Sequence, residues 1–229
     1  MSTNRRKAIS LIITVFMIVS LLTLTSCNRK YDKDEVITAT KILLKDAEML
    51  NKVYYGSGIE YFDSKETNIG SYCKANPEHL KTLGFTTIDE LKELTEKTFS
   101  DGYSTVLYNT ILENLSDDVS IVSPVRYIQE YDEKTGEPTY IMVYSKFEPM
   151  LKDSIAYDYD SLTVKESKKD RVYVNVNATV TTSDGKTQNT TLTITLVEED
   201  DGWRIDNPTY ANYSEAKDRY DEIKDLEIK

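Results

Sequence analysis

The chain has 229 residues, of which 39 % are hydrophobic and 29 % charged, and 39 acidic against 28 basic side chains give a net charge of −11. Binding to nucleic acid depends on Lys and Arg that neutralise phosphates, so we expect no nucleic acid partner for a chain this acidic. The apolar fraction is ample for a core, which argues against global disorder. A chain of this length suits one domain or two small lobes.

Residues 1–26 have the layout of a signal peptide. A basic leader of Arg5, Arg6 and Lys7 precedes an uncharged run over residues 8–24, and this order is typical of secretory signals. The segment holds three bases and no acids, so the chain from Cys27 onward has 39 acids against 25 bases. No later apolar run approaches the ~18 residues needed to cross a bilayer, and we therefore expect a soluble body.

The sequence Leu24-Thr25-Ser26-Cys27 resembles the lipobox of bacterial lipoproteins. The resemblance implies that the Cys27 sulfur receives a diacylglyceryl group and that residues 27–34 form the lipidated cysteine and a polar tether. Each buried methylene contributes about 0.8 kcal/mol, so two acyl chains give stable anchoring. The expected location is the extracytoplasmic face of the cell membrane; the alternatives are an ordinary secretory signal and an uncleaved membrane helix. Lipidation of Cys27 leaves Cys73 without a disulfide partner.

Residues 35–213 are expected to form one α+β domain. The first helix is predicted from Glu35 onward, because apolar residues recur there at near-heptad spacing. These residues are Val36, Leu43, Ala47, Leu50 and Tyr54. Glycines at 56 and 58 end this helix, a short strand is predicted over 59–62, and residues 64–77 are predicted to be a loop.

Two further helices are predicted before the strands begin. Thr87 and Glu90 form a capping-box pattern, in which each side chain satisfies a free amide of the first helical turn. A helix of three turns should follow and end near Phe99. Ser100 and Asp101 start a second helix, and its buried side is expected to include Tyr103, Val106, Leu107, Thr110 and Ile111.

After residue 114 the hydrophobic period changes from 3.6 to 2, which predicts strands over 125–131, 139–144 and 157–164. The clearest alternation covers residues 172–181 and 191–196, with hairpin turns at Asp184-Gly185 and Asp201-Gly202. This antiparallel meander has one apolar face and one Thr/Asn face, and the upstream helices should cover the apolar face. The predicted fold class is therefore α+β, with N-terminal helices packed on a bent meander sheet. Residues 214–229, capped by Ser214, are predicted to be a charged helical tail.

Residues 198–206, which include Gly202-Trp203-Arg204-Ile205, resemble the final hairpin of cystatin-like and nuclear-transport-factor-2-like domains. The resemblance implies helices wrapped by a strongly bent antiparallel sheet, in one lobe or two. It implies little about activity, because that fold hosts enzymes, carriers and interaction modules.

A second resemblance covers about residues 36–210. The segment 84–92, the segment 99–103, the central strand–loop–strand and the meander are similar in order to the IseA-type inhibitors of cell-wall DL-endopeptidases. That family is extracytoplasmic, acidic, two-lobed and non-catalytic, and it blocks papain-like peptidoglycan peptidases with a loop near the lobe junction. This chain departs from the family in its lipobox and in the long polar stretch at 63–77. None of the family's contact positions can be carried over.

No catalytic, metal or cofactor site is assigned. Cys73 and His79 could form a nucleophile–base pair, but no third group orients them and no protease signature surrounds them. One cysteine and one histidine do not make a usual zinc set. Asp158 and Asp160 lie on one predicted strand face, where repulsion could leave an acid beside a base; a solvated strand edge is the simpler interpretation. We therefore expect a protein that is not an enzyme.

Tyrosine is over-used, with 17 residues against 5 Phe and 1 Trp. Many should be core or sheet residues, but tyrosine also suits recognition surfaces, and several flank the acidic loop at 132–138. The residues expected to contact a partner there are Tyr127, Glu130, Tyr131, Asp132, Glu133, Glu137 and Tyr140. Tyr144 extends the same aromatic platform, and the carboxylates would steer it toward a basic groove. The expected partner is a cell-wall peptidase; the alternative function is small-ligand binding in a conical pocket.

Overall fold

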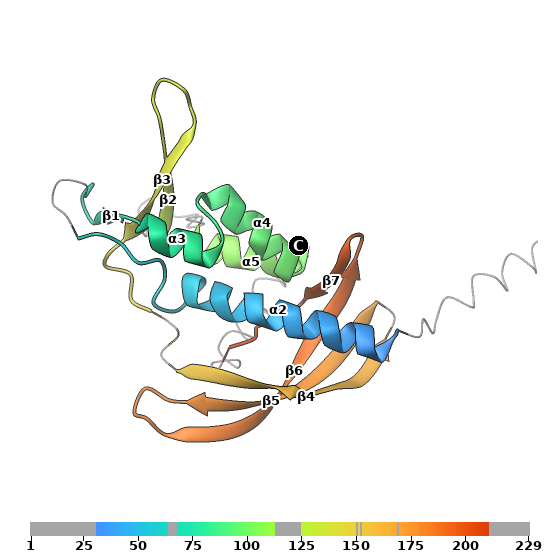
Figure 1. Cartoon of the computed structure of the whole chain (residues 1–229). Helices are drawn as coiled ribbons and strands as arrows, with labels where there is room; N and C mark the ends of the chain where they lie inside the picture. Colours follow the sequence, from blue (N-terminus) through green and yellow to red (C-terminus); the bar gives the residue numbers. More distant parts are fainter. Residues whose placement is uncertain are drawn as a thin grey trace, which may run out of the picture.

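The computed structural model describes residues 31–63, 68–112, 125–149, 151, 153–168 and 170–210. The signal peptide, Cys27, the start of the tether and the tail at 214–229 lie outside the described residues and stay predictions. Helices and two antiparallel sheets make up the rest (Figure 1), so the predicted α+β class with a meander sheet is confirmed. Among the described residues, no helix is long and apolar enough to span a membrane.

Helix α2 (Lys33–Tyr54) is the long helix that the apolar spacing predicts. All five residues named for its inner face, Val36, Leu43, Ala47, Leu50 and Tyr54, are buried. The helix begins two residues earlier than predicted, because the Asp32 carboxylate accepts hydrogen bonds from the amides of Asp34 (2.9 Å) and Glu35 (3.3 Å). An aspartate at this position satisfies amides that the first helical turn leaves free.

Three shorter helices follow: α3 (Pro77–Leu83), α4 (Ile88–Thr98) and α5 (Asp101–Ile111). The capping box of α4 is confirmed: Thr87 Oγ1 accepts from the Glu90 amide at 3.1 Å, and Glu90 Oε2 accepts from the Thr87 amide at 3.3 Å. Ser100 caps α5 as predicted. Helix α3 falls partly in the predicted loop, although Asn76-Pro77 and the left-handed Gly84 are the usual signals for its start and end.

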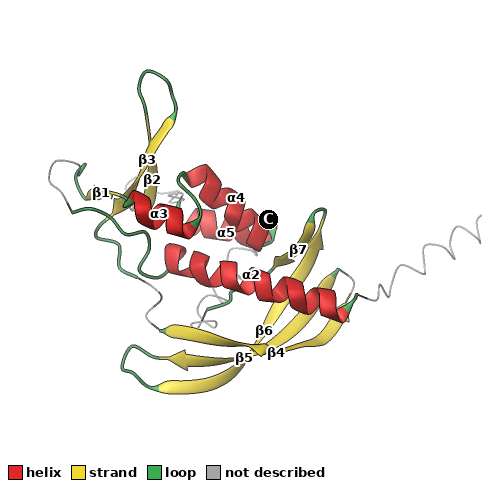
Figure 2. Cartoon of the chain, viewed as in Figure 1, coloured by secondary structure: helices red, strands yellow, loops and turns green. Residues whose placement is uncertain are grey.

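The meander sheet runs in the order β4 (Ser154–Lys168), β5 (Arg171–Thr181), β6 (Thr187–Glu199) and β7 (Gly202–Ile205). Its register matches the alternation, since Val174 pairs with Ile194 and Val176 with Leu192. The valines point to the core, while Thr and Asn residues alternate with them. Figure 2 shows the helices on one side of this sheet, as expected for a sheet with one apolar face.

The small sheet has the order β1-β3-β2, formed by β1 (Tyr72–Lys74), β3 (Pro138–Tyr144) and β2 (Tyr127–Tyr131). The predicted loop at 64–77 is therefore wrong over β1, which pairs Tyr72 with Tyr144. The predicted strand at 59–62 is reduced to one bridge between Tyr61 and Ala75. Three residues are too few to show a period, so local pattern could not reveal β1.

One hydrophobic core serves both sheets. Its buried cluster includes Ile141 and Val143 from the small sheet, Leu44 and Leu50 from α2, and Val174 from the meander. Helix α2 lies between the two sheets (Figure 1) and contributes side chains to the same cluster. The small sheet is therefore joined to the meander through a shared core, and β2 also contacts α4.

Candidate protein-binding hairpin

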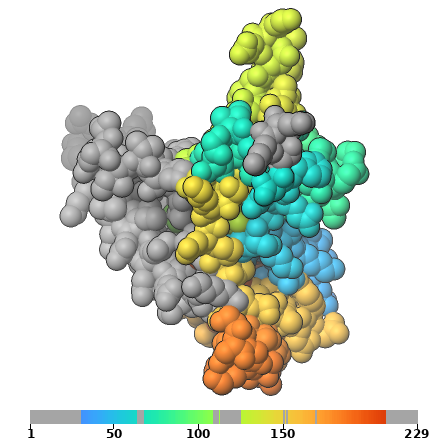
Figure 3. Space-filling view, turned by 90° about the vertical axis from the view of Figure 1, so that its left-hand side faces the viewer, coloured from blue at the N-terminus to red at the C-terminus, as the bar shows by residue number. Residues whose placement is uncertain are grey.

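The β2–β3 hairpin, drawn in yellow-green, extends away from the body of the molecule (Figure 1) and stands above the neighbouring surface in Figure 3. Residues 131–139 are all exposed. The tip and its base carry four carboxylates and one lysine, namely Glu130, Asp132, Glu133, Glu137 and Lys134. The hairpin therefore presents a negatively charged end to solvent.

The tip of the hairpin is held in one conformation by its own side chains. Asp132 Oδ1 accepts hydrogen bonds from the amides of Lys134 (2.9 Å) and Thr135 (2.8 Å), and Gly136 supplies the left-handed residue with φ +71°. The amides of Thr135 and Lys134 hold the pKa of the Asp132 carboxyl below its usual value of 3.8. Asp132, predicted to contact a partner, thus also shapes the loop that carries Glu133 and Glu137.

The base of the hairpin is tied to helix α4 by Gln129. Its Oε1 accepts from the Ile88 amide at 3.0 Å, and its Nε2 donates to the Tyr140 carbonyl at 3.2 Å. The register between β2 and β3 shifts at Glu130 and Tyr131, and such a bulge turns a hairpin away from the plane of its sheet. No local sequence signal marked Gln129, because its partner Ile88 is distant along the chain.

Tyr127 is not part of the exposed surface, and its prediction as a partner contact is wrong. Its side chain is 2 % exposed, and its hydroxyl donates to the Val53 carbonyl at 2.6 Å and accepts from the Ile59 amide at 3.2 Å. Burial raises the pKa of Tyr127 to about 12. The pleat of β2 directs this tyrosine into the core, so spacing alone could not assign it to the surface.

The other tyrosines do not form a single platform. Tyr131 is 55 % exposed at the bulge. Tyr140 is half-buried with Lys74 Nζ 4.2 Å from its ring centroid, and Tyr144 packs on Tyr72 with ring centroids 5.3 Å apart. The sequence did not identify Tyr72 and Lys74 as neighbours, because β1 was expected to be a loop. Of the predicted contact residues, Tyr131, Asp132, Glu133 and Glu137 share the projecting part of the hairpin, and Glu130 and Tyr140 pair with each other at its base.

Arg126 joins the hairpin to the end of α2. This buried guanidinium donates from Nη1 to the Tyr54 carbonyl and from Nη2 to the Gly56 carbonyl, both at 2.7 Å. Carbonyls at a helix C-terminus carry partial negative charge, which suits a cation. Burial lowers the pKa of Arg126 from its usual value. A Cβ at Gly58 would lie 2.2 Å from Arg126 Nη2, so only glycine fits beside it.

Cys73 and His79 are not arranged as a nucleophile and its base. Cys73 is 3 % exposed on β1, where it pairs with Val143. His79 lies in α3, and its Nδ1 accepts from the Glu60 amide at 2.9 Å. That bond leaves the imidazole proton on Nε2 and gives His79 a structural role.

The acidic residues of β4 are not arranged as an acid–base pair either. Asp158 and Asp160 lie at a break in the strand register and are both exposed. Asp160 pairs with Lys41 at 3.3 Å, and Asp158 Oδ1 accepts from the Asp160 amide at 3.2 Å. Across the described ranges, no group of three or more His, Cys, Asp or Glu residues could hold a metal ion.

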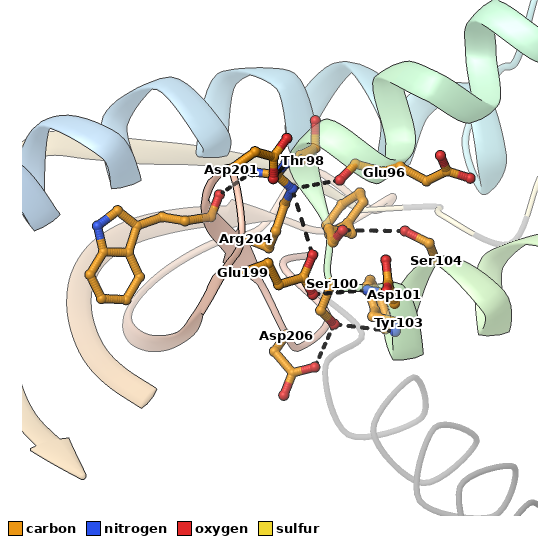
Figure 4. Close-up of polar contacts among 12 residues, drawn as sticks. Glu96, Thr98, Ser100, Asp101, Tyr103, Ser104, Glu199, Asp201, Arg204 and Asp206 are labelled. Atoms are coloured by element: carbon orange, nitrogen blue, oxygen red, sulfur yellow. Dashed lines mark hydrogen bonds and ion pairs between the residues drawn. The ribbon is translucent and has the colours of Figure 1, made fainter. Parts of the chain in front are cut away.

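A dense polar cluster joins the last hairpin of the meander to α4 and α5 (Figure 4). Arg204 donates to the Glu96 carbonyl at 2.6 Å and to Asp201 Oδ1 at 2.5 Å. Ser100 donates to Asp206 Oδ1 at 2.5 Å, and Arg171 also pairs with Asp206. The cluster lacks a histidine that could activate Ser100, since the one histidine lies in α3. The hydrogen bonds and ion pairs of this cluster connect the last hairpin to the helices.

Glu199 takes part in the same cluster. Its carboxylate accepts from the Asp101 amide at 3.2 Å, at the start of α5, and lies 3.9 Å from Arg204 Nε. Burial raises the pKa of Glu199 above its usual 4.5. The carboxylate therefore fastens α5 to the end of β6, and the cluster explains why the predicted Gly-Trp-Arg-Ile strand sits against the helices.

Comparison of the whole chain with known proteins gave no match to a protein family, to a curated protein or to a solved structure.

Proposed function

We propose that this protein is a lipoprotein, anchored through Cys27 at the extracytoplasmic face of the cell membrane, that inhibits or regulates cell-wall DL-endopeptidases by binding them. The observation that carries the proposal is the projecting, internally braced hairpin with its acidic tip. The similarity in element order to IseA-type inhibitors and the lipobox resemblance support the partner class and the location. In this proposal the hairpin acts by binding the peptidase, and no catalytic group takes part.

The physical basis of inhibition is a preformed loop that enters a complementary groove. Because Asp132 and Gly136 already hold the turn, little conformational freedom is lost when a partner binds. The carboxylates of Glu133 and Glu137 would speed association with a basic surface, and such steering weakens with ionic strength. Tyr131, large and exposed, is the side chain best suited to become a buried anchor at the interface.

The inhibitor role is tested with the protein expressed from the full chain and purified in mild detergent. We expect it to slow the digestion of purified peptidoglycan by a DL-endopeptidase, measured as loss of turbidity, and to do so more strongly at low salt. Charge reversal by Glu133→Lys with Glu137→Lys should weaken inhibition about 10-fold at low salt. Tyr131→Ala should weaken it by a similar factor at all salt concentrations.

A matched control reverses two exposed carboxylates away from the hairpin. Glu93→Lys with Asp200→Lys changes the net charge by the same amount, on α4 and on the β6–β7 turn. This variant should inhibit as the unmodified protein does. Unchanged digestion at micromolar protein and low salt, or equal loss in the control, would refute the hairpin as an inhibitory site.

The anchor is tested separately by metabolic labelling with a fatty-acid analogue. The protein should be labelled and should fractionate with membranes, and the Cys27→Ala variant should be neither labelled nor retained. Equal labelling of both would show that the lipid is not on Cys27.

Small-ligand binding is the second candidate, and a surface hollow of about 400 Å³ favours it. The hollow lies between the end of α2 and the start of β4, and Glu48, Lys52, Leu151, Asp153 and Tyr210 contribute to its lining. It is an open hollow rather than the conical cavity expected beneath the helices. Thermal stabilisation by a small molecule that Leu151→Trp abolishes would favour this role over inhibition.

A further inference from the structure

The outer face of the meander carries a row of cross-strand Thr–Asn pairs. Thr179 donates to Asn189 Oδ1 at 3.0 Å, Thr191 to Asn177 Oδ1 at 2.9 Å, and Thr193 to Asn175 Oδ1 at 2.9 Å. In each pair the two residues stand directly opposite each other on β5 and β6. The three pairs therefore form one continuous polar strip on the face opposite the buried valines of β5.

The pairing fixes which groups remain for a ligand. Each threonine uses its hydroxyl proton and each asparagine uses its side-chain carbonyl, so the Nδ2 groups of Asn175, Asn177 and Asn189 have no partner among the described residues. An amide nitrogen carries two N–H donors, and a threonine oxygen retains acceptor capacity. The strip consequently offers fixed donors and acceptors that repeat every second residue along the two strands.

The position of Asn177 is further constrained by the bulge in β4. Ser161 donates to the Asp158 carbonyl at 2.7 Å and accepts from the Asn177 amide at 2.8 Å. The backbone beneath the strip is thus held from both neighbouring strands. A surface held this way loses little freedom when it binds a ligand.

A hollow of about 750 Å³ lies over two of these pairs, Thr179–Asn189 and Asn177–Thr191. Its lining includes Asp158, Asn177, Thr179, Asn189 and Thr191, and Asp158 is its one formally charged residue. The large apolar side chains that are exposed elsewhere in the described chain, Ile42, Tyr61, Phe62, Ile69 and Tyr131, lie outside it. The hollow therefore lacks the basic residues that bind polyanions, and its apolar lining consists of Ala156, Ala178 and Tyr157 rather than a cluster of large exposed side chains.

We propose that this hollow binds a glycan strand, an uncharged polymer of hydroxyl and acetamido groups. Apart from Asp158, the polar side chains that line the hollow are neutral amides and hydroxyls. They can exchange hydrogen bonds with the neutral hydroxyl and acetamido groups of such a polymer. Tyr173, half-buried on the same face beyond Asn175, adds an aromatic ring at the end of the strip, next to Lys168 at 5.7 Å. This site lies on the meander, separate from the hairpin, and does not depend on the inhibitor role.

The test uses the N-acetylglucosamine hexamer as probe, titrated calorimetrically into the protein made from the full chain. Asn189→Asp keeps an oxygen to accept from Thr179, so the strip is retained, but it removes the two free N–H donors of a side chain that lines the hollow. Two lost hydrogen bonds should weaken binding about 10-fold or more. The control Asn76→Asp makes the same chemical change on another element, where the new carboxylate still accepts from the Glu78 amide, and it should bind as the unmodified protein does.

Saturable binding that the strip variant loses and the control keeps would support the glycan site. The absence of binding at millimolar hexamer would overturn it, as would binding that the strip variant leaves unchanged. Urea unfolding of the strip variant, expected to match that of the control, separates loss of the ligand groups from loss of the fold.

Discussion

The two sheets of this protein are assembled in different ways. The meander joins four strands that follow one another in sequence, and each pairs with its neighbour. The small sheet takes β1 from before α3, α4 and α5, and takes β2 and β3 from after them. The meander can therefore find its register from short hairpins, whereas the small sheet requires distant segments to meet.

The difference extends to what holds each sheet in place. The meander is held by the alternation of buried valines with outward Thr and Asn residues. The small sheet depends on a few specific contacts with the end of α2, made by Arg126 and Tyr127 beside Gly58. We expect single substitutions at that junction to cost much more than substitutions on the outer face of the meander.

The largest expected effect comes from Gly58→Ala. Its new Cβ would lie 2.2 Å from Arg126 Nη2 and 2.7 Å from the Tyr127 hydroxyl, at φ +79°. The collision and the left-handed backbone together should lower the free energy of unfolding in urea by at least about 3 kcal/mol. Gly185→Ala, in the meander turn at φ +82° with no atom within 4 Å, should cost only about 1–2 kcal/mol. Equal losses in the free energy of unfolding would mean that backbone strain alone accounts for the effect of both substitutions.

Arg126→Met should have the next largest effect. It removes the hydrogen bonds to the Tyr54 and Gly56 carbonyls and leaves both in a buried position, at a cost of about 3 kcal/mol. Lys168→Met removes an exposed pair with Glu166 at the edge of the meander, and should cost less than about 1 kcal/mol. Denaturant unfolding of both variants measures the contrast, and similar values would contradict a special role for the junction.

Substitution of the outer strip should change stability little. Thr191→Val removes the exposed hydrogen bond to Asn177 but keeps a β-branched side chain in the strand, so we expect a change within about 0.5 kcal/mol. Val176→Ala, on the buried face of the same sheet, should lose about 2 kcal/mol or more. A large loss at Thr191 would assign the strip a structural role.

The smallest effect is a local one at the hairpin tip. Because the folded-state pKa of Asp132 lies below the usual 3.8, its hydrogen bonds to the turn persist above pH 3.8 and are lost as the pH falls through the lowered value. The Thr135 amide resonance should follow this transition, and the contribution of this carboxyl to global stability is lost over the same pH range. Asp132→Asn keeps an oxygen that can accept these hydrogen bonds but does not titrate, so it should abolish the pH-dependent change of the Thr135 resonance. A midpoint above 3.8 would contradict the arrangement of the turn.

The sequence predicted where the acidic loop lies but not which of the tyrosines around it are exposed, for reasons that follow from the strand geometry. The acidic loop, its exposure and the tyrosines around it could be recognised from the sequence. Tyr127 could not be separated from Tyr131 in this way, because the pleat and a bulge decide which of them faces solvent. Gln129, Arg126 and Lys74 were missed because their partners belong to elements far away along the chain.

Local sequence by itself determined the amphipathic α2, the capping box at Thr87, the start of α5 at Ser100 and the meander with its two turns. These features depend on side-chain period and on caps within a few residues, which are properties that a short segment carries alone. Tertiary structure alone decided that β1 joins β3, that Tyr127 lies in the core and that Arg126 supports the hairpin. Each of those outcomes depends on contacts between segments that are distant along the chain. The sequence of each segment alone favours no single arrangement, so the arrangement is determined only when the segments pack together.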